Sequence, residues 1–203
     1  MPFKKLNSNI KERLEFLKIT APTKFQSSSI PVIKSGVNVY CTASKNSGKT
    51  TTLILTTLHK LKCEAVGSAP RAFVLVENKE RALELYDLFS IYTRYNSLRV
   101  YVAHEQIHID LQKSEIFEGI DILIASTESM NKLFLLNGIS ISSIKLFSID
   151  DAEFLLKRSG YATLLSMSQS IKKCQFVLYS EKIPPKLRGL DSYFMEHSRT
   201  VSS

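Results

Sequence analysis

The chain has 203 residues, of which 44% are hydrophobic and 23% charged, a composition typical of a single soluble globular domain with a substantial core. Its three cysteines are far apart and form no CxxC pair, which argues against a disulfide framework or a zinc site and fits a reducing cytoplasm. The net charge of +8 favours a polyanionic partner such as nucleic acid, although many basic proteins bind none.

The N-terminus lacks the apolar core of a signal peptide, and no stretch approaches the roughly 18 uncharged apolar residues of a membrane span. We therefore expect a cytoplasmic protein with no membrane segment.

Along the chain, apolar strand-like runs alternate with helical patterns. The expected elements, in chain order, are helix 8–17, a short helix from about 22 toward 33, strand 37–41, helix 50–61, strand 72–76, helix 81–92, strand 99–103, strand 120–125, helix 128–136, strand 144–149, helix 161–170, strand 175–179 and helix 184–193. This alternation predicts an α/β fold, a mostly parallel sheet with helices on both faces and right-handed crossovers.

A phosphate-binding loop is predicted between the strand at 37–41 and the helix at 50–61. It consists of Ala43, Ser44, Lys45, Asn46, Ser47, Gly48, Lys49 and Thr50, and departs from the strict pattern by starting with Ala. Backbone N–H groups would hold phosphate oxygens, with Thr51 next to them on the helix. Lys49 would reach the β- and γ-phosphates, and Thr50 would offer its hydroxyl to Mg²⁺. The alternative is an ordinary glycine turn that caps a helix.

A run of acidic residues, Asp150-Asp151-Ala152-Glu153, follows the buried strand at 144–149. The carboxyl ends of strands form the edge at which α/β sheets bind ligands. Asp150 could hold Mg²⁺, and Asp151 could orient or deprotonate an attacking water. The alternative is a helix N-cap whose acids are favoured by the helix dipole.

Two further features carry weaker signals. Gln26, in Pro22-Thr23-Lys24-Phe25-Gln26, could read the adenine edge with its amide, although a proline turn with a threonine N-cap and a surface glutamine explains the same residues. His104 and His108 flank a segment where a helix is doubtful, and no third strong ligand accompanies them, so a metal site is not favoured.

Together these motifs resemble the first RecA-like domain of DEAD-box RNA helicases, over residues 3 to about 201. Pro22 to Gln26 resembles the Q motif, with Gln26 as the adenine-reading residue and Phe3 as its aromatic partner. Ile19 takes the place of an aromatic residue near adenine, and Lys18 that of a glycine. The loop from Ala43 to Thr50 resembles motif I, with Asn46 in place of the usual glycine; asparagine tolerates left-handed backbone better than most residues. The acidic run stands where Asp-Glu-Ala-Asp is usual.

The segments that hold RNA in that family are eroded. The Pro-Thr-Arg-Glu-Leu segment reads Glu77-Asn78-Lys79-Glu80-Arg81, and the Thr-Pro-Gly-Arg segment reads Ser126-Thr127-Glu128-Ser129. The Gly-Gly pair is missing near His104. The coupling motif Ser-Ala-Thr, which is not one of the RNA segments, reads Ser180-Glu181-Lys182. Glu77 and Glu128 would repel phosphate, which leaves Asn78, Lys79, Ser126 and Thr127 as the residues that could still contact RNA.

The resemblance implies a three-layer RecA-like P-loop NTPase domain over residues 1–203, in which residues 1–36 form the N-terminal helices that carry the Q motif. The implied cofactors are ATP and Mg²⁺, and Lys49, Asp150 and Asp151 would be catalytic. The second RecA-like domain of the family, with its arginine finger, is absent from this chain, so unwinding would require that domain in cis or in trans. The alternatives are a non-catalytic helicase-derived module that keeps a nucleotide or recruits a partner, and a P-loop enzyme of another class such as a kinase.

Overall fold

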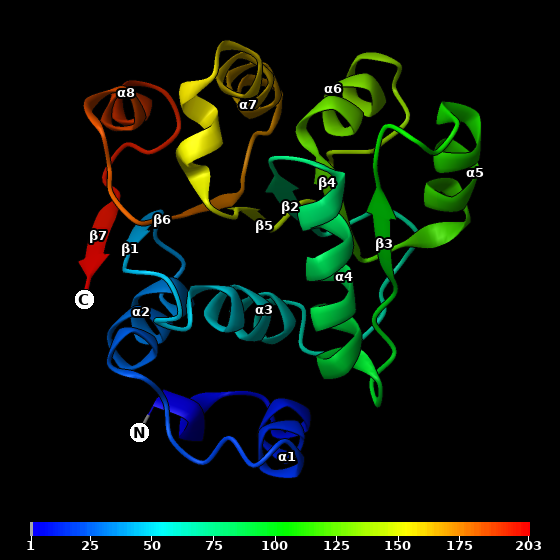
Figure 1. Cartoon of the computed structure of the whole chain (residues 1–203). Coiled ribbons are helices and arrows are strands. Elements are labelled where there is room, and N and C mark those ends of the chain that lie inside the picture. The colour runs from blue at the N-terminus through cyan, green and yellow to red at the C-terminus, as the bar shows by residue number, and fades with distance from the viewer. Residues whose placement is uncertain (1) are drawn as a thin grey trace.

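A parallel sheet forms the middle layer of the computed structural model, which describes residues 2–203 apart from the side chains of residues 2, 4, 158 and 159. Its strands follow the order β3-β4-β2-β5-β6-β1-β7, and every strand pair is parallel (Figure 1). The strands are β1 Val39–Thr42, β2 Ala72–Val76, β3 Val100–Ala103, β4 Ile122–Ser126, β5 Leu146–Ile149, β6 Gln175–Ser180 and β7 Arg199–Ser202. All residues of β2, β4, β5 and β6 are buried, because helices cover both faces of the sheet.

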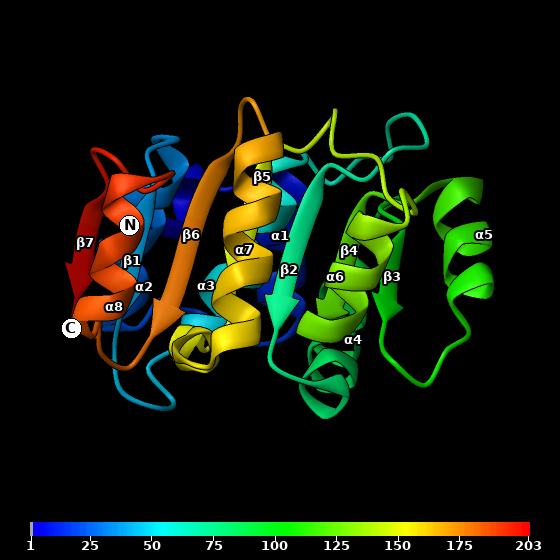
Figure 2. The ribbon, with the colours of Figure 1, turned by 90° about the horizontal axis from the view of Figure 1, so that it is seen from above.

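Helices from the two halves of the chain cover opposite faces of the sheet (Figures 1 and 2). One face carries η1 Pro2–Lys5, α1 Ser8–Phe16, α2 Lys24–Lys34, α3 Lys49–Lys60 and α4 Lys79–Thr93. The other carries α5 Ile109–Gly119, α6 Thr127–Leu135, η2 Ala152–Leu156, α7 Arg158–Ser170, α8 Pro185–Arg188 and η3 Gly189–Ser192. The core is correspondingly divided into two apolar clusters, one on each side of the sheet. The expected three-layer α/β architecture is confirmed.

Several elements differ from the expectations, and the short 3₁₀ helices η1 and η2 are among those that no pattern predicts. Helix α5 was missed because few of its residues face the core: Ile116 is buried, whereas Leu111 and Phe117 are exposed. Strand β7 was missed because it is an edge strand beside β1 in which Val201 alone is buried. The expected helix at 184–193 divides at Gly189 into short α8 and η3.

The two histidines near α5 lie in different settings. His108 caps this helix, its ring accepting a hydrogen bond from the Asp110 N–H at 3.4 Å, and His104 is buried. No group of three or more metal-ligating side chains of His, Cys, Asp and Glu occurs within the described residues. Among the described residues, no helix is both long and apolar enough to cross a membrane.

Candidate nucleotide-binding site

The predicted phosphate-binding loop connects β1 to α3 at the carboxyl edge of the sheet. The Ala43 N–H donates to the Ser180 carbonyl at 3.2 Å, which extends the pairing of β1 with β6 into the loop. Asn46 has φ 62° and Gly48 has φ 95°, so both adopt the left-handed backbone conformation. This is the conformation for which asparagine was expected to substitute for glycine. The loop therefore keeps its turn despite the irregular sequence.

Lys49 lies inside this loop. Lys49 is 7% exposed. Its ammonium donates to the carbonyls of Ala43 at 2.6 Å and Ser44 at 3.0 Å. A cavity of about 470 Å³ opens beside it, lined by Lys45 to Thr51, Arg81, Glu84, Leu88 and Asp151. Of the predicted loop residues, Lys45 to Thr50 thus border one cavity together with Thr51 and Asp151, whereas Ala43 and Ser44 do not line it.

Gln26 connects the N-terminal segment to the loop. It caps α2 reciprocally with Thr23: the Thr23 N–H donates to Gln26 Oε1 at 2.9 Å, and the Gln26 N–H donates to Thr23 Oγ1 at 3.1 Å. Gln26 Nε2 lies 3.5 Å from the Gly48 carbonyl, and Thr23 Oγ1 donates to the Ser47 carbonyl at 2.7 Å. The threonine N-cap is therefore present, but Gln26 is 4% exposed rather than on the surface.

Gly48 has to be glycine at this contact. A Cβ atom there would lie 2.6 Å from Gln26 Nε2, and φ is positive. The close approach of Gly48 to Gln26 couples the Q-motif segment to the phosphate loop.

Phe3 and Ile19 lie together, but away from the loop. They line a separate pocket of about 310 Å³ between η1, α1 and the segment before α2, and no loop residue lines it. Lys18, which stands where the family has glycine, adopts φ 58°. The adenine-packing role of Phe3 and Ile19 therefore stays a prediction.

Asp150 lies at the end of β5, next to the end of β2. Its N–H donates to the Leu75 carbonyl at 3.0 Å, and the residue is 1% exposed. Burial raises the pKa of the Asp150 carboxyl to about 6, even though the Arg81 guanidinium acts in the opposite direction. Asp151 follows with φ 47°, and its side chain is 56% exposed at the rim of the cavity. The two acids therefore lie in different environments: Asp150 is buried and Asp151 is exposed to solvent.

Arg81 lies at this cavity although no sequence pattern singled it out. Its Nε and Nη2 both contact Asp150 Oδ2, at 2.7 and 2.5 Å, and Nη2 also donates to Thr50 Oγ1 at 3.0 Å. Nη1 donates to Glu84 Oε2 at 2.8 Å. The one signal in the sequence was an arginine at the position where the family segment ends in leucine.

This arrangement bears directly on the predicted Mg²⁺ site. The Thr50 hydroxyl and the Asp150 carboxylate are oxygen ligands of the type that Mg²⁺ prefers. Both are already bonded to one nitrogen of Arg81. As arranged here, the residues do not fit a Mg²⁺ ion bound to both side chains.

The four residues predicted to contact RNA lie at the carboxyl ends of β2 and β4, where they make internal hydrogen bonds. Asn78 caps α4, Lys79 donates to the side chain of Gln106, and Thr127 donates to the Val76 carbonyl at 3.0 Å. Ser126 is 1% exposed and donates to Glu105 at 2.9 Å.

Carboxylates surround this edge of the sheet. Glu105 accepts hydrogen bonds from its own backbone N–H and from Ser126, which lower the pKa of its carboxyl. Glu77 pairs with Lys157, and Glu128 pairs with Lys132 at 2.7 Å. Carboxylates thus stand beside the predicted RNA-contact residues, two of them paired with lysines, and a carboxylate repels phosphate.

Glu153 links the acidic run to the segment that replaces Ser-Ala-Thr. Its Oε1 accepts a hydrogen bond from the Glu181 N–H at 2.5 Å. The acidic run and the segment after β6 are therefore in direct contact.

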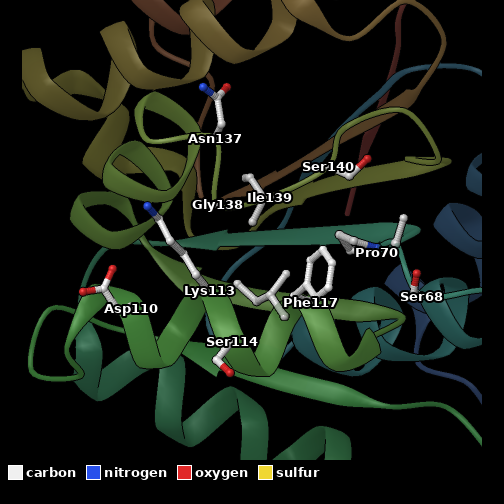
Figure 3. Close-up of a pocket in the computed structure, with 12 residues that line it drawn as sticks. Ser68, Pro70, Asp110, Lys113, Ser114, Phe117, Asn137, Gly138, Ile139 and Ser140 are labelled. Carbon is white, nitrogen blue, oxygen red and sulfur yellow. The ribbon is translucent and has the colours of Figure 1, made fainter.

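A larger cavity than the one at the phosphate loop lies elsewhere. Figure 3 shows this space of about 730 Å³ between α5, with Phe117 and Lys113, and the segments around Pro70 and Ile139. None of the predicted motif residues lines it. Volume alone is thus a poor guide to the site here, and the convergent polar groups mark the smaller cavity instead.

Comparison with known proteins agrees with this geometry. The family model for the DEAD/DEAH box helicase matches residues 23–185. The chain is 25% identical over 199 residues to the ATP-dependent RNA helicase DeaD of Buchnera aphidicola subsp. Acyrthosiphon pisum (strain APS), which covers 97% of this chain and 33% of that protein. It is 24% identical over 203 residues to the probable ATP-dependent RNA helicase ddx3 of Dictyostelium discoideum, covering 90% of this chain and 28% of that protein.

Among solved structures, a DEAD box protein from the hyperthermophile Methanococcus jannaschii superposes with a TM-score of 0.88 at 16% identity, covering 98% of this chain and 54% of that one. The chain thus spans about a third of the length of the curated relatives it matches. With a family match over most of its residues, the chain belongs to the DEAD/DEAH box helicase family.

Proposed function

We propose that this chain binds ATP as the ATP-binding domain of a DEAD-box ATP-dependent RNA helicase. The observation that carries the proposal is the convergence of the phosphate loop with Gln26, which approaches Gly48, and with Asp150, which Arg81 links to Thr50. These residues come from three separate segments, and a glycine turn that merely capped a helix would need neither of the other two.

Lys49 supplies the main charge for the phosphates in this proposal. Its ammonium would exchange the carbonyls of Ala43 and Ser44 for phosphate oxygens, a change that replaces neutral acceptors by charged ones. The loop N–H groups and the N-terminus of α3 would add further donors. Gln26, held between Thr23 and Gly48, would offer the remaining N–H donor and oxygen acceptor site of its amide to the adenine edge.

Calorimetric titration with ATP tests the proposal through Lys49→Ala. Loss of charge-assisted hydrogen bonds worth about 1.5–3 kcal/mol weakens binding about 10- to 100-fold. Lys132→Ala is the matched control, because Lys132 lies on α6 and pairs with Glu128. Failure of the wild-type chain to bind millimolar ATP would refute the proposal.

ATP hydrolysis coupled to RNA is proposed only when a second RecA-like domain is supplied. Asp151 would orient the attacking water, since its side chain is exposed at the cavity rim. Asn78, Lys79, Ser126 and Thr127 offer limited RNA contacts among the acids described above. RNA-stimulated turnover that Asp151→Asn abolishes is the expected result in the presence of that domain.

A non-catalytic nucleotide-binding module is the second candidate. One observation favours it: Arg81 bonds both Thr50 and Asp150, the side chains that were expected to serve catalysis through a metal. Turnover assays with and without RNA, at saturating ATP and with a second domain added in trans, separate the two candidates. Turnover at background level in every condition supports the inert module.

A further inference from the structure

The Arg81 guanidinium occupies the position between the two side chains expected to bind a metal ion. A single nitrogen, Nη2, lies 3.0 Å from Thr50 Oγ1 and 2.5 Å from Asp150 Oδ2. Nε makes a second bond to the same carboxylate oxygen at 2.7 Å. The contact joins the first turn of α4 to the first turn of α3 and the end of β5.

The surroundings of Arg81 hold it in this position. Glu84, one turn along α4, accepts from Nη1 at 2.8 Å and keeps the far side of the guanidinium in place. Asp151 adds a second carboxylate 3.9 Å from Nη2. The Arg81 side chain is 21% exposed and lines the cavity beside the phosphate loop. The guanidinium is therefore held by carboxylates and still borders the cavity beside the loop.

A fixed cation at this point performs the electrostatic task of a metal. It offsets the buried charge of Asp150, and it places positive charge next to the loop where phosphate oxygens would bind. A divalent ion bound to Thr50 and Asp150 would have to displace Nη2, and it would then share the site with a repelling guanidinium.

We propose that Arg81 replaces the divalent cation, so that this phosphate loop binds nucleotide without Mg²⁺. The proposal rests on nucleotide binding at the loop, as argued above, and specifies the form of nucleotide that is bound. The ligand is the metal-free nucleoside triphosphate or diphosphate, and added Mg²⁺ competes for its phosphates without improving affinity.

Arg81→Leu is the informative variant, because leucine ends the corresponding family segment. Arg94→Leu is its matched control: Arg94 lies at the other end of α4, is exposed and contacts the ring of Tyr95. Each protein is titrated with ATP by calorimetry, once in Mg²⁺ and once in EDTA. We expect wild type and Arg94→Leu to bind at least as well in EDTA. Arg81→Leu should bind about tenfold more weakly in EDTA than in Mg²⁺, since it lacks both cations.

A second measurement needs no nucleotide. Arg81→Leu leaves the Asp150 carboxylate buried without its cation, so its Tm should fall, by on the order of 5 °C. Millimolar Mg²⁺ should raise the Tm of this variant and leave that of the wild type unchanged. The buffer contains no Ca²⁺, and a Na⁺ series of equal ionic strength is the control.

The two measurements distinguish failure of this inference from failure of the proposed function. If wild type binds ATP and Mg²⁺ tightens that binding about tenfold or more, the inference is overturned while nucleotide binding stands. If wild type binds no ATP in either buffer, the proposed function fails. The melting series then tests the remaining claim, that Arg81 takes the place of the cation: a rise in wild-type Tm with Mg²⁺ equal to that of Arg81→Leu overturns this claim.

Discussion

Asp121, at the start of β4, is expected to be a major determinant of stability. The residue is fully buried, and its carboxylate accepts from Arg71 Nη2 at 2.6 Å and from Arg99 Nε at 2.9 Å. The backbone N–H groups of Val66 and Arg99 each donate to it at 3.1 Å. One side chain thus ties together the segments that precede β2, β3 and β4.

The substitution Asp121→Asn keeps the shape of the side chain and removes its charge. It turns one acceptor into a donor that faces N–H groups, and it leaves Arg71 buried without a counter-charge. Breaking a buried ion pair costs about 3–5 kcal/mol, and we take about 3 kcal/mol because the Arg99 side chain is 37% exposed. At about 2–4 °C per kcal/mol for a chain of this size, the expected loss in Tm is about 6–12 °C.

The stability that Asp121 contributes depends on pH and is lost in acid. Burial alone would raise the pKa of Asp121, but the hydrogen bonds from Arg99, Val66 and Arg71 outweigh it and hold the pKa below its usual value. A lowered folded-state pKa gives stability that is present above the unfolded pKa, near about 3.9, and is lost as the pH falls through the folded value. Acidification below about pH 4 should therefore destabilise wild type more steeply than Asp121→Asn.

Thermal melts followed by far-UV circular dichroism are the suitable assay, because the chain has no tryptophan. Asp110→Asn is the control, since its side chain is 75% exposed and should change stability by less than about 0.5 kcal/mol. A Tm of Asp121→Asn within about 2 °C of that of Asp110→Asn would refute the reasoning.

Three further substitutions test the site. Gln26→Ala should lower the free energy of unfolding by about 1 kcal/mol, because it removes half of a capping box. It should also erase any preference for ATP over GTP, and a preference that is retained in competition titrations contradicts the adenine role. Asn46→Val should lower the free energy of unfolding, measured by urea denaturation, by about 1–2 kcal/mol, because the backbone at position 46 is left-handed and strains a branched side chain. Asn46→Gly should stay close to wild type, and equal stabilities of the two variants would rule out backbone strain as the cause. Glu105→Ala removes the carboxylate bonded to Ser126 and should raise affinity for a single-stranded RNA oligonucleotide at low salt, and an unchanged affinity would count against charge as the cause of weak RNA binding.

Much of this protein follows from local sequence. Continuous apolar runs predicted β2, β4 and β5, since a strand covered on both faces needs no polar side. The phosphate loop was predicted because a strand, a Gly48-Lys49-Thr50 turn and a helix follow one another directly. The tolerance of this loop for Asn46 also followed, because a left-handed conformation is a property of one residue and its side chain.

The tertiary structure decided what these residues contact. Arg81 and Asp150 are 69 positions apart, and they meet because β2 pairs with β5 in a register that places Leu75 opposite Ile149. Gln26 meets Gly48 because α2 packs on α3. Sequence spacing predicts which residues share an edge of the sheet, but the strand order determines which edge neighbours touch. The arginine at the predicted metal position therefore became evident only in the folded chain.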